Sequence, residues 1–169
     1  MEVLIAGMGN VLRSDDAFGV KVAERLLTDR IPRGVRVIEV GIGGIHLVQE
    51  LLEPVEALVI LDAVEVERPP GTVVVMSPEI LDVKAMSLME RHDQLADMHY
   101  AVPERALMLA RALEILPRIT WIVGCQPADA SSWGEEMSPE VRQAIEPAAD
   151  EVRRIVDELG IAWFEDEVS

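Results

Sequence analysis

The chain has 169 residues, half of them hydrophobic, which fits a single globular domain spanning residues 1–169 and excludes a disordered chain. Its formal net charge of −16 argues against nucleic acid and anionic membranes as partners, and its one cysteine excludes an internal disulfide and a thiolate-rich metal cluster. No basic leader and no apolar run of about 18 residues is found, so we expect a soluble, cytoplasmic protein.

Apolar, β-branched runs alternate with helical patterns along the chain, which is typical of an α/β fold. In chain order we expect a strand at 3–6, a helix at 17–27, a strand at 35–40, a helix at 45–52, strands at 58–61 and 72–76, a helix at 103–116, a strand at 119–124 and one long helix at 139–159. Ser138 is the expected cap of this last helix. The pattern predicts a three-layer α/β/α sandwich around a mostly parallel, twisted sheet of about five strands, with strand 72–76 at an edge.

The most informative segment is the loop that follows the first strand, from Gly7 to Gly19. A phosphate-binding loop needs exposed N–H groups, and the carboxylates of Asp15 and Asp16 would repel a phosphate. The dinucleotide-binding pattern also wants a third glycine where this chain has Leu12, although Glu39 could serve as its acidic residue. The loop therefore favours a cation over a nucleotide.

Two aspartates lie at the ends of expected strands. Asp16 comes just after the first strand, and Asp62 ends the third. In such sheets ligands bind beyond the carboxyl ends of strands where the strand order reverses, so both carboxylates reach one crevice if these strands are neighbours. Simpler roles stay open, because Asp16 or Asp15 can cap the following helix and Asp62 can stabilise a turn.

One histidine beside the two aspartates would complete a three-ligand site for a divalent metal, with open positions for water or a substrate group. The chain offers His46, His92 and His99, each of which can also be a plain surface residue. Cys125 has no neighbouring base in the sequence, which favours a structural thiol over a nucleophile.

The pattern Gly7-x-Gly9-Asn10-x-Leu12-x-x-Asp15-Asp16-x-x-Gly19 resembles the N-terminal signature of the [NiFe]-hydrogenase maturation endopeptidases. The resemblance covers almost the whole chain. Further matching segments are Leu61-Asp62-Ala63, Pro70-Gly71-Thr72, the region around His99, Gly124-x-Gln126-Pro127 and the last helix ending at Gly160.

The resemblance implies an endopeptidase that removes the C-terminal extension of a [NiFe]-hydrogenase large-subunit precursor after nickel insertion. The nickel is supplied by the precursor, and no organic cofactor is implied. Carried over residue by residue, the nickel-recognition and catalytic site falls on Asp16, Asp62 and His99, since the spacing from His99 to Pro127 follows the family. His92 is the alternative, because the sequence around it also resembles the family's histidine segment.

The chain departs from the family pattern after the second strand. The family often has Asp-Gly-Gly-Thr there, whereas this chain has Glu39-Val40-Gly41-Ile42-Gly43-Gly44. This change leaves two alternatives open: a nickel-binding accessory or scaffold protein in hydrogenase maturation without peptidase activity, and a metal-independent peptidase on the same fold.

Overall fold

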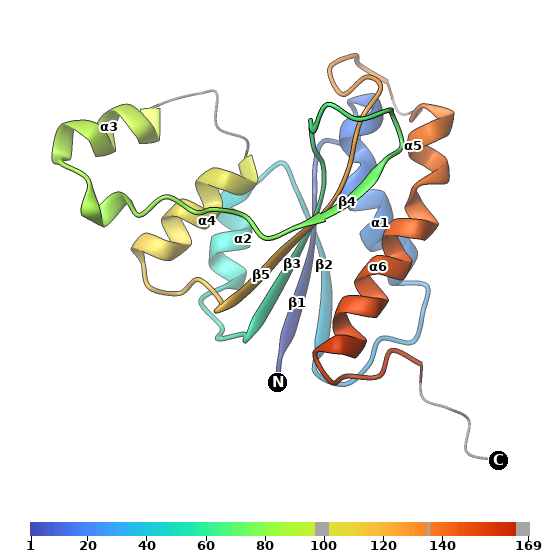
Figure 1. The fold of residues 1–169 in the computed structure, drawn as a ribbon, viewed down its shortest axis with the longest axis horizontal. Coiled ribbons are helices and arrows are strands. Elements are labelled where there is room, and N and C mark those ends of the chain that lie inside the picture. Colours follow the sequence, from blue (N-terminus) through green and yellow to red (C-terminus); the bar gives the residue numbers. More distant parts are fainter. Residues whose placement is uncertain (97–101, 135, 165–169) are drawn as a thin grey trace.

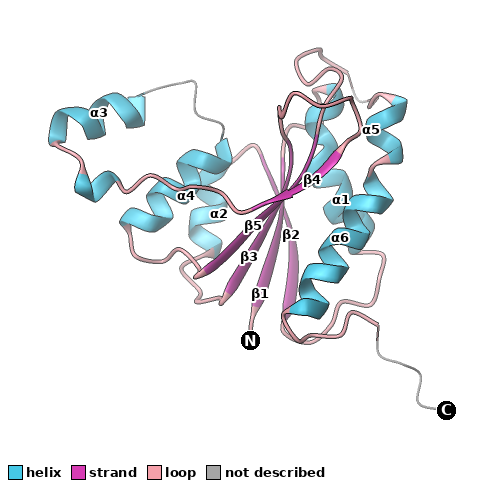
Figure 2. Cartoon of the chain, viewed as in Figure 1, coloured by secondary structure: helices cyan, strands magenta, loops and turns pink. Residues whose placement is uncertain are grey.

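The computed structural model describes residues 1–96, 102–134 and 136–164 and shows one sheet with helices on both faces (Figures 1 and 2). Its strands are β1 (Val3–Met8), β2 (Val35–Gly41), β3 (Ala57–Ala63), β4 (Val73–Met76) and β5 (Ile119–Cys125). Its helices are α1 (Phe18–Leu26), α2 (Gly44–Glu50), α3 (Leu88–Ala96), α4 (Val102–Ala112), α5 (Pro139–Gln143) and α6 (Ile145–Glu158), with short 3-10 turns η1 (Ser14–Ala17) and η2 (Val83–Ala85). The predicted three-layer sandwich is confirmed.

The sheet has the strand order β2-β1-β3-β5-β4. β4 runs antiparallel to β5 at the edge, as predicted, and the other pairs are parallel. The chain leaves β1 for β2 on one side and then crosses to β3 on the other, so the strand order reverses between β1 and β3. Ligands bind at such reversal points in open α/β sheets, which directs attention to the loops after these two strands.

Alternating side chains of the central strands feed two apolar layers. Val59 and Leu61 of β3 pack in the layer beneath α1 and α6, whereas Leu58 and Ile60 pack in the layer beneath α2 and α4. All four side chains are fully buried, and truncating one of them to Ala is expected to cost about 2–5 kcal/mol. Asp62 continues the alternation of Leu58 and Ile60, so this carboxylate faces the layer of α2 and α4.

The last helical segment differs from the prediction of one continuous helix. It is divided into α5 and α6 at Ala144, because Pro147 lacks the N–H that would bond to Gln143 and its ring crowds that carbonyl group. Ser138 occupies the N-cap position, but its hydroxyl donates to a carboxylate elsewhere instead of capping. Helix α3 was not among the predicted elements.

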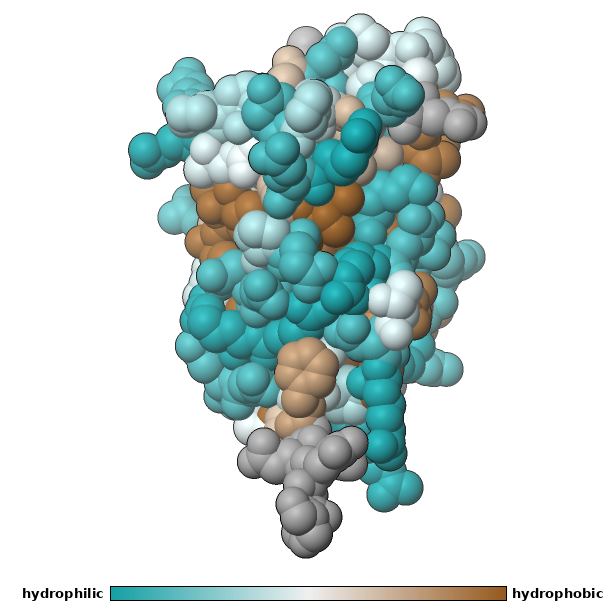
Figure 3. Space-filling model, turned by 90° about the vertical axis from the view of Figure 1, so that its right-hand side faces the viewer, coloured by the Kyte–Doolittle hydropathy of each residue, from teal (hydrophilic) through white to brown (hydrophobic). Residues whose placement is uncertain are grey.

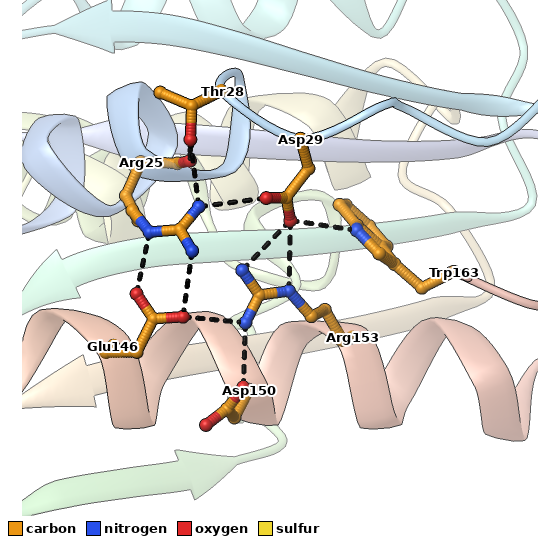
Figure 4. Close-up of polar contacts among 7 residues, drawn as sticks. All are labelled: Arg25, Thr28, Asp29, Glu146, Asp150, Arg153 and Trp163. Atoms are coloured by element: carbon orange, nitrogen blue, oxygen red, sulfur yellow. Dashed lines mark hydrogen bonds and ion pairs between the residues drawn. The ribbon is translucent and has the colours of Figure 1, made fainter.

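A network of charged side chains joins α1 to α6 on the face of the sheet that these two helices cover (Figure 4). Arg153 is 7% exposed and donates to Asp29 at 2.9 Å, Glu146 at 3.0 Å and Asp150 at 2.7 Å. Arg25 adds hydrogen bonds to Asp29 and Glu146.

The exposed surface over α5 and α6 is mostly hydrophilic (Figure 3). Within the described ranges, none of the helices is long and apolar enough to cross a bilayer.

Candidate active site

A cavity of about 230 Å³ opens at the carboxyl ends of β1 and β3. It is lined by Met8, Gly9, Asp16, Gly41, Ile42, Asp62, Ala63 and Pro103. The structure thus brings Asp16 and Asp62 to one cavity at the point where the strand order reverses, as the sequence predicted. A larger hollow of about 570 Å³ lies among residues 30–33 and 162–164 and contains neither aspartate.

The tight turn after β1 positions the carboxylate of Asp16. Gly9 has φ +122°, and a Cβ atom there would lie 1.8 Å from the carbonyl oxygen of Asp16, so only glycine permits this approach. The backbone N–H of Asn10 donates to Asp16 Oδ2 at 2.8 Å, while the Asn10 side chain accepts from the N–H of Leu12 at 2.9 Å. Backbone contacts therefore hold this carboxylate at the mouth of the cavity.

Neither aspartate of the first loop caps a helix. No side chain caps η1 or α1, so the capping roles considered for Asp15 and Asp16 are wrong. Asp15 is fully buried and accepts hydrogen bonds from the N–H groups of Ala128, Asp129 and Ser138 at 2.7–2.9 Å and from the Ser138 hydroxyl. It therefore ties the first loop to the loop that follows β5, a role that sequence reasoning missed because the bonded residues are more than 110 positions away.

Asp62 is only 8% exposed. Burial, and then the negative charge of the neighbouring Asp16, raise its pKa from 3.8 to about 8, against a smaller opposing effect of the Ala63 N–H. None of the described residues that line the cavity is Lys or Arg. Two carboxylates thus share a cavity without a compensating cation, and that arrangement suits a site for an incoming positive charge.

The structure brings no described histidine to the two aspartates. His99 lies outside the described residues. His92 is on α3 with an 83% exposed side chain beside Asp93, and His46 lies 3.3 Å from Glu50. In the part of the chain that the structure describes, no three His, Cys, Asp or Glu side chains come together as a metal site, so neither His46 nor His92 joins the two aspartates.

Two other singled-out residues lie close to the site. Glu39 is exposed near the end of β2 and lines a groove of about 350 Å³ next to the cavity. Cys125 is fully buried, and burial followed by the charge of Asp15 raises the pKa of its thiol to about 11. A neutral, buried thiol is inert, which agrees with the structural role expected for it.

Gln126, part of the resemblance but without a role there, fixes the loop after β3. Its side-chain oxygen accepts from the N–H of Val66 at 2.8 Å, and its amide nitrogen donates to Glu65 at 2.6 Å. The loop after Asp62 is thereby bonded to the end of β5. In the sequence, the resemblance to the family included Gly124-x-Gln126-Pro127 but gave no role for Gln126.

A profile of the hydrogenase maturation protease family matches residues 20–155. The chain belongs to this family. The matched range contains Asp62 and begins just after Asp16, but the similarity to individual relatives extends over nearly the whole chain. The hydrogenase expression/formation protein HupD of Rhodobacter capsulatus is 33% identical over 94% of this chain and 73% of its own length. HupM of Azotobacter chroococcum mcd 1 is 34% identical with the same coverage.

Solved structures of maturation proteases share the fold. The hydrogenase maturating endopeptidase HybD of E. coli superposes with a TM-score of 0.79 over all of both chains at 24% identity. The hydrogenase 2 maturation peptidase of a Thaumarchaeota archaeon is 34% identical, with a TM-score of 0.65 over 95% of this chain and 99% of its own. This hydrogenase maturation protease is thus an endopeptidase by family, in preference to the accessory protein without peptidase activity.

Proposed function

We propose that this protease removes the C-terminal extension of a [NiFe]-hydrogenase large-subunit precursor after nickel insertion, and that it recognises the nickel held by the precursor. The observation that carries the proposal is the carboxylate pair, Asp16 and Asp62, on one cavity at the reversal point of the sheet. The relatives named as hydrogenase expression/formation proteins support the hydrogenase precursor as the partner.

The charge arrangement suits a divalent ion that arrives with the substrate. The raised pKa of Asp62 means that this side chain carries a proton near neutral pH, and metal binding must displace it. Asp16 faces the same cavity as a second oxygen ligand, and His99 is the proposed nitrogen ligand. With only these three protein ligands, coordination positions stay open for groups of the precursor.

The same groups can also take part in hydrolysis of the scissile peptide bond. A carboxylate at the cavity can take a proton from the attacking water, and the substrate's nickel can polarise the scissile carbonyl. Asp62, with a pKa of about 8, releases its proton when the ion binds and is then an ionised carboxylate beside the bond to be cut. Cleavage therefore depends on nickel, because a precursor without the ion leaves Asp62 protonated.

The test is the intact mass of a cognate precursor incubated with the protease, with and without nickel in the precursor. Loss of a C-terminal peptide only from the nickel-loaded form is expected. Asp16→Asn and Asp62→Asn should each abolish this loss, whereas Glu53→Gln, at a side chain that is 80% exposed, should leave it unchanged. Cleavage of both precursor forms at equal rates would reject nickel recognition and favour the metal-independent peptidase.

The histidine assignment has its own matched pair. His99→Ala should abolish processing, and His92→Ala, at an exposed side chain on α3, should retain it. The reverse result would move the third ligand to His92 and require α3 to approach the cavity in the complex. Circular dichroism of both variants controls for loss of folding.

A further inference from the structure

The first loop and the loop after β5 together form an exposed surface beside the carboxylate cavity. Trp133 is 71% exposed, Leu12 50% and Val11 40%. Ile42 from the β2–α2 turn is 67% exposed and lines one groove with Val11 and Leu12. We call Val11, Leu12, Arg13, Ile42 and Trp133 the rim surface.

The rim surface is continuous with the candidate active site. Its groove shares Gly9, Gly41 and Ile42 with the cavity that holds Asp16 and Asp62. The guanidinium of Arg13 lies 4.6 Å from the centre of the Trp133 ring, and Gly134 next to Trp133 donates its N–H to the carbonyl of Leu12 at 2.9 Å. A partner bound at the carboxylates can therefore contact this neighbouring surface as well.

Hydrogen bonds within the protein anchor the loop that carries Trp133. The buried carboxylate of Asp15 bonds both ends of the loop that carries Trp133, at Ala128 and Ser138. The N–H groups of Ser131 and Ser132 donate to Asp129 at 2.9 and 3.0 Å. A surface ordered in advance loses little conformational entropy on binding, and Trp and Arg are the side chains that most often dominate binding energy.

The guanidinium of Arg13 has no acidic partner among the residues that the structure describes. No ion pair joins it to an acid in residues 1–96, 102–134 and 136–164, and its Nε is buried with no hydrogen-bond partner there. The exposed Trp133 beside it completes a surface that carries a positive charge, although the net charge of the chain is −16. Such a cation fits a carboxylate on a partner surface that is otherwise apolar.

We infer that the rim surface is the docking site for the hydrogenase precursor, binding an apolar part of it through Trp133, Leu12 and Ile42 and one of its carboxylates through Arg13. This inference rests on the proposed function for the identity of the partner. It assigns substrate affinity to side chains that are separate from the carboxylate pair. Binding and cleavage are therefore expected to respond to different substitutions.

The test compares two exposed aromatic side chains that each lie over an arginine. Trp133→Ala should raise KM for the nickel-loaded precursor about tenfold, which corresponds to about 1.4 kcal/mol of lost binding, and leave kcat within about twofold. Phe164→Ala is the matched control, because Phe164 is 67% exposed and lies 5.7 Å from Arg153 but lines the distant hollow of residues 30–33. Its KM should not change.

Arg13→Gln should raise KM and flatten the dependence of KM on salt, because the charge contact is screened by ions. Combined with Trp133→Ala its effect should be less than additive, since the two side chains touch. Equal KM values for the wild type, Trp133→Ala and Phe164→Ala would overturn the docking site.

Dissociation constants for the nickel-free and the nickel-loaded precursor, measured by biolayer interferometry with the same variants, separate the two proposals. If the wild type binds both forms but cleaves neither, the proposed function fails, and a tenfold higher Kd for Trp133→Ala still supports docking at the rim surface. If the wild type binds neither form of the precursor, the docking site is overturned as well.

Discussion

Asp29 and Asp62 lie on opposite sides of the sheet, and their surroundings shift their pKa values in opposite directions. Asp29 lies between α1 and α6, where its side chain is 12% exposed (Figure 4). Burial acts to raise its pKa, but hydrogen bonds from Arg25, Arg153 and Trp163 outweigh it, and the pKa falls below its usual value. Among the described residues that line its cavity, the one charged neighbour of Asp62 is Asp16, and the pKa of Asp62 rises to about 8.

The difference separates the acids that hold the fold together from those that are available for function. The three acids of the network share the guanidinium groups of Arg25 and Arg153, so each carboxylate has a positive neighbour within the chain. The pair at the cavity stays uncompensated, and the chain bears the cost of burying it. A natural sequence tolerates such a local conflict at a functional site, where an incoming ligand can relieve it.

The largest expected effect comes from breaking the network at Arg153. Arg153→Met leaves Asp29 and Glu146 without their buried partner, and the free energy of unfolding should fall by about 3–5 kcal/mol. The matched control is Arg154→Met, whose side chain is 51% exposed and should cost under about 1 kcal/mol. Urea unfolding followed by circular dichroism measures both. Similar losses in the two variants would mean that the network adds no more than surface ion pairs.

The same substitution at the two aspartates should change stability in opposite directions. Asp29→Asn removes an acceptor from two arginines and should lower the free energy of unfolding by about 2–3 kcal/mol. Asp62→Asn removes a side chain that must take up a proton on folding at pH 7, and it should raise the free energy of unfolding by about 2–4 kcal/mol while abolishing processing. A lower melting temperature for Asp62→Asn would contradict the raised pKa of Asp62.

The gain from Asp62→Asn should depend on pH. Because the pKa of Asp62 is raised from 3.8 to about 8 on folding, the native state holds this proton more tightly than the unfolded state. Its contribution to stability is complete below about pH 4 and is lost as the pH rises toward 8, by up to about 1.4 kcal/mol per pH unit. The advantage of the Asn variant should therefore grow between pH 5 and pH 8 in urea-unfolding series. An advantage that stays constant would exclude this titration.

Much of this fold is readable in the sequence, because the apolar runs of β1, β3 and β5 and the turn at Pro69-Pro70-Gly71 have one simple interpretation each. The break before α6 was missed although its cause is local. The apolar stripe from Val141 to Leu159 predicted one continuous helix, and the effect of Pro147 was not taken into account. Helix α3 was missed for a different reason. Residues 88–96 have no apolar face comparable to the stripe of α6, so periodicity gave no signal.

The sequence predicted which two aspartates line the cavity, but not the hydrogen bonds that hold the surrounding loops together. That Asp16 and Asp62 meet followed from strand ends and a plausible strand order, which the sheet then supplied. The role of Asp15 did not follow, because its partners Ala128, Asp129 and Ser138 are distant in sequence and all three donate backbone N–H groups, which no motif specifies. Long-range backbone bonding of this kind is determined only by the tertiary structure.

The smallest expected effect tests the coupling between the two carboxylates themselves. Burial is the first cause of the raised pKa of Asp62, and the charge of Asp16 is the second. Asp16→Asn should therefore lower the pKa of Asp62 without returning it to 3.8, which carbon NMR titration of the side-chain carboxyl groups can follow. Glu53→Gln, at an exposed side chain, should leave that titration unchanged. A pKa of Asp62 that does not move in Asp16→Asn would mean that the carboxylates do not sense each other, and the case for a shared cation site would then rest on the cavity alone. A pKa that falls back to its usual value would instead make Asp16, and not burial, the reason that Asp62 holds its proton until a cation arrives.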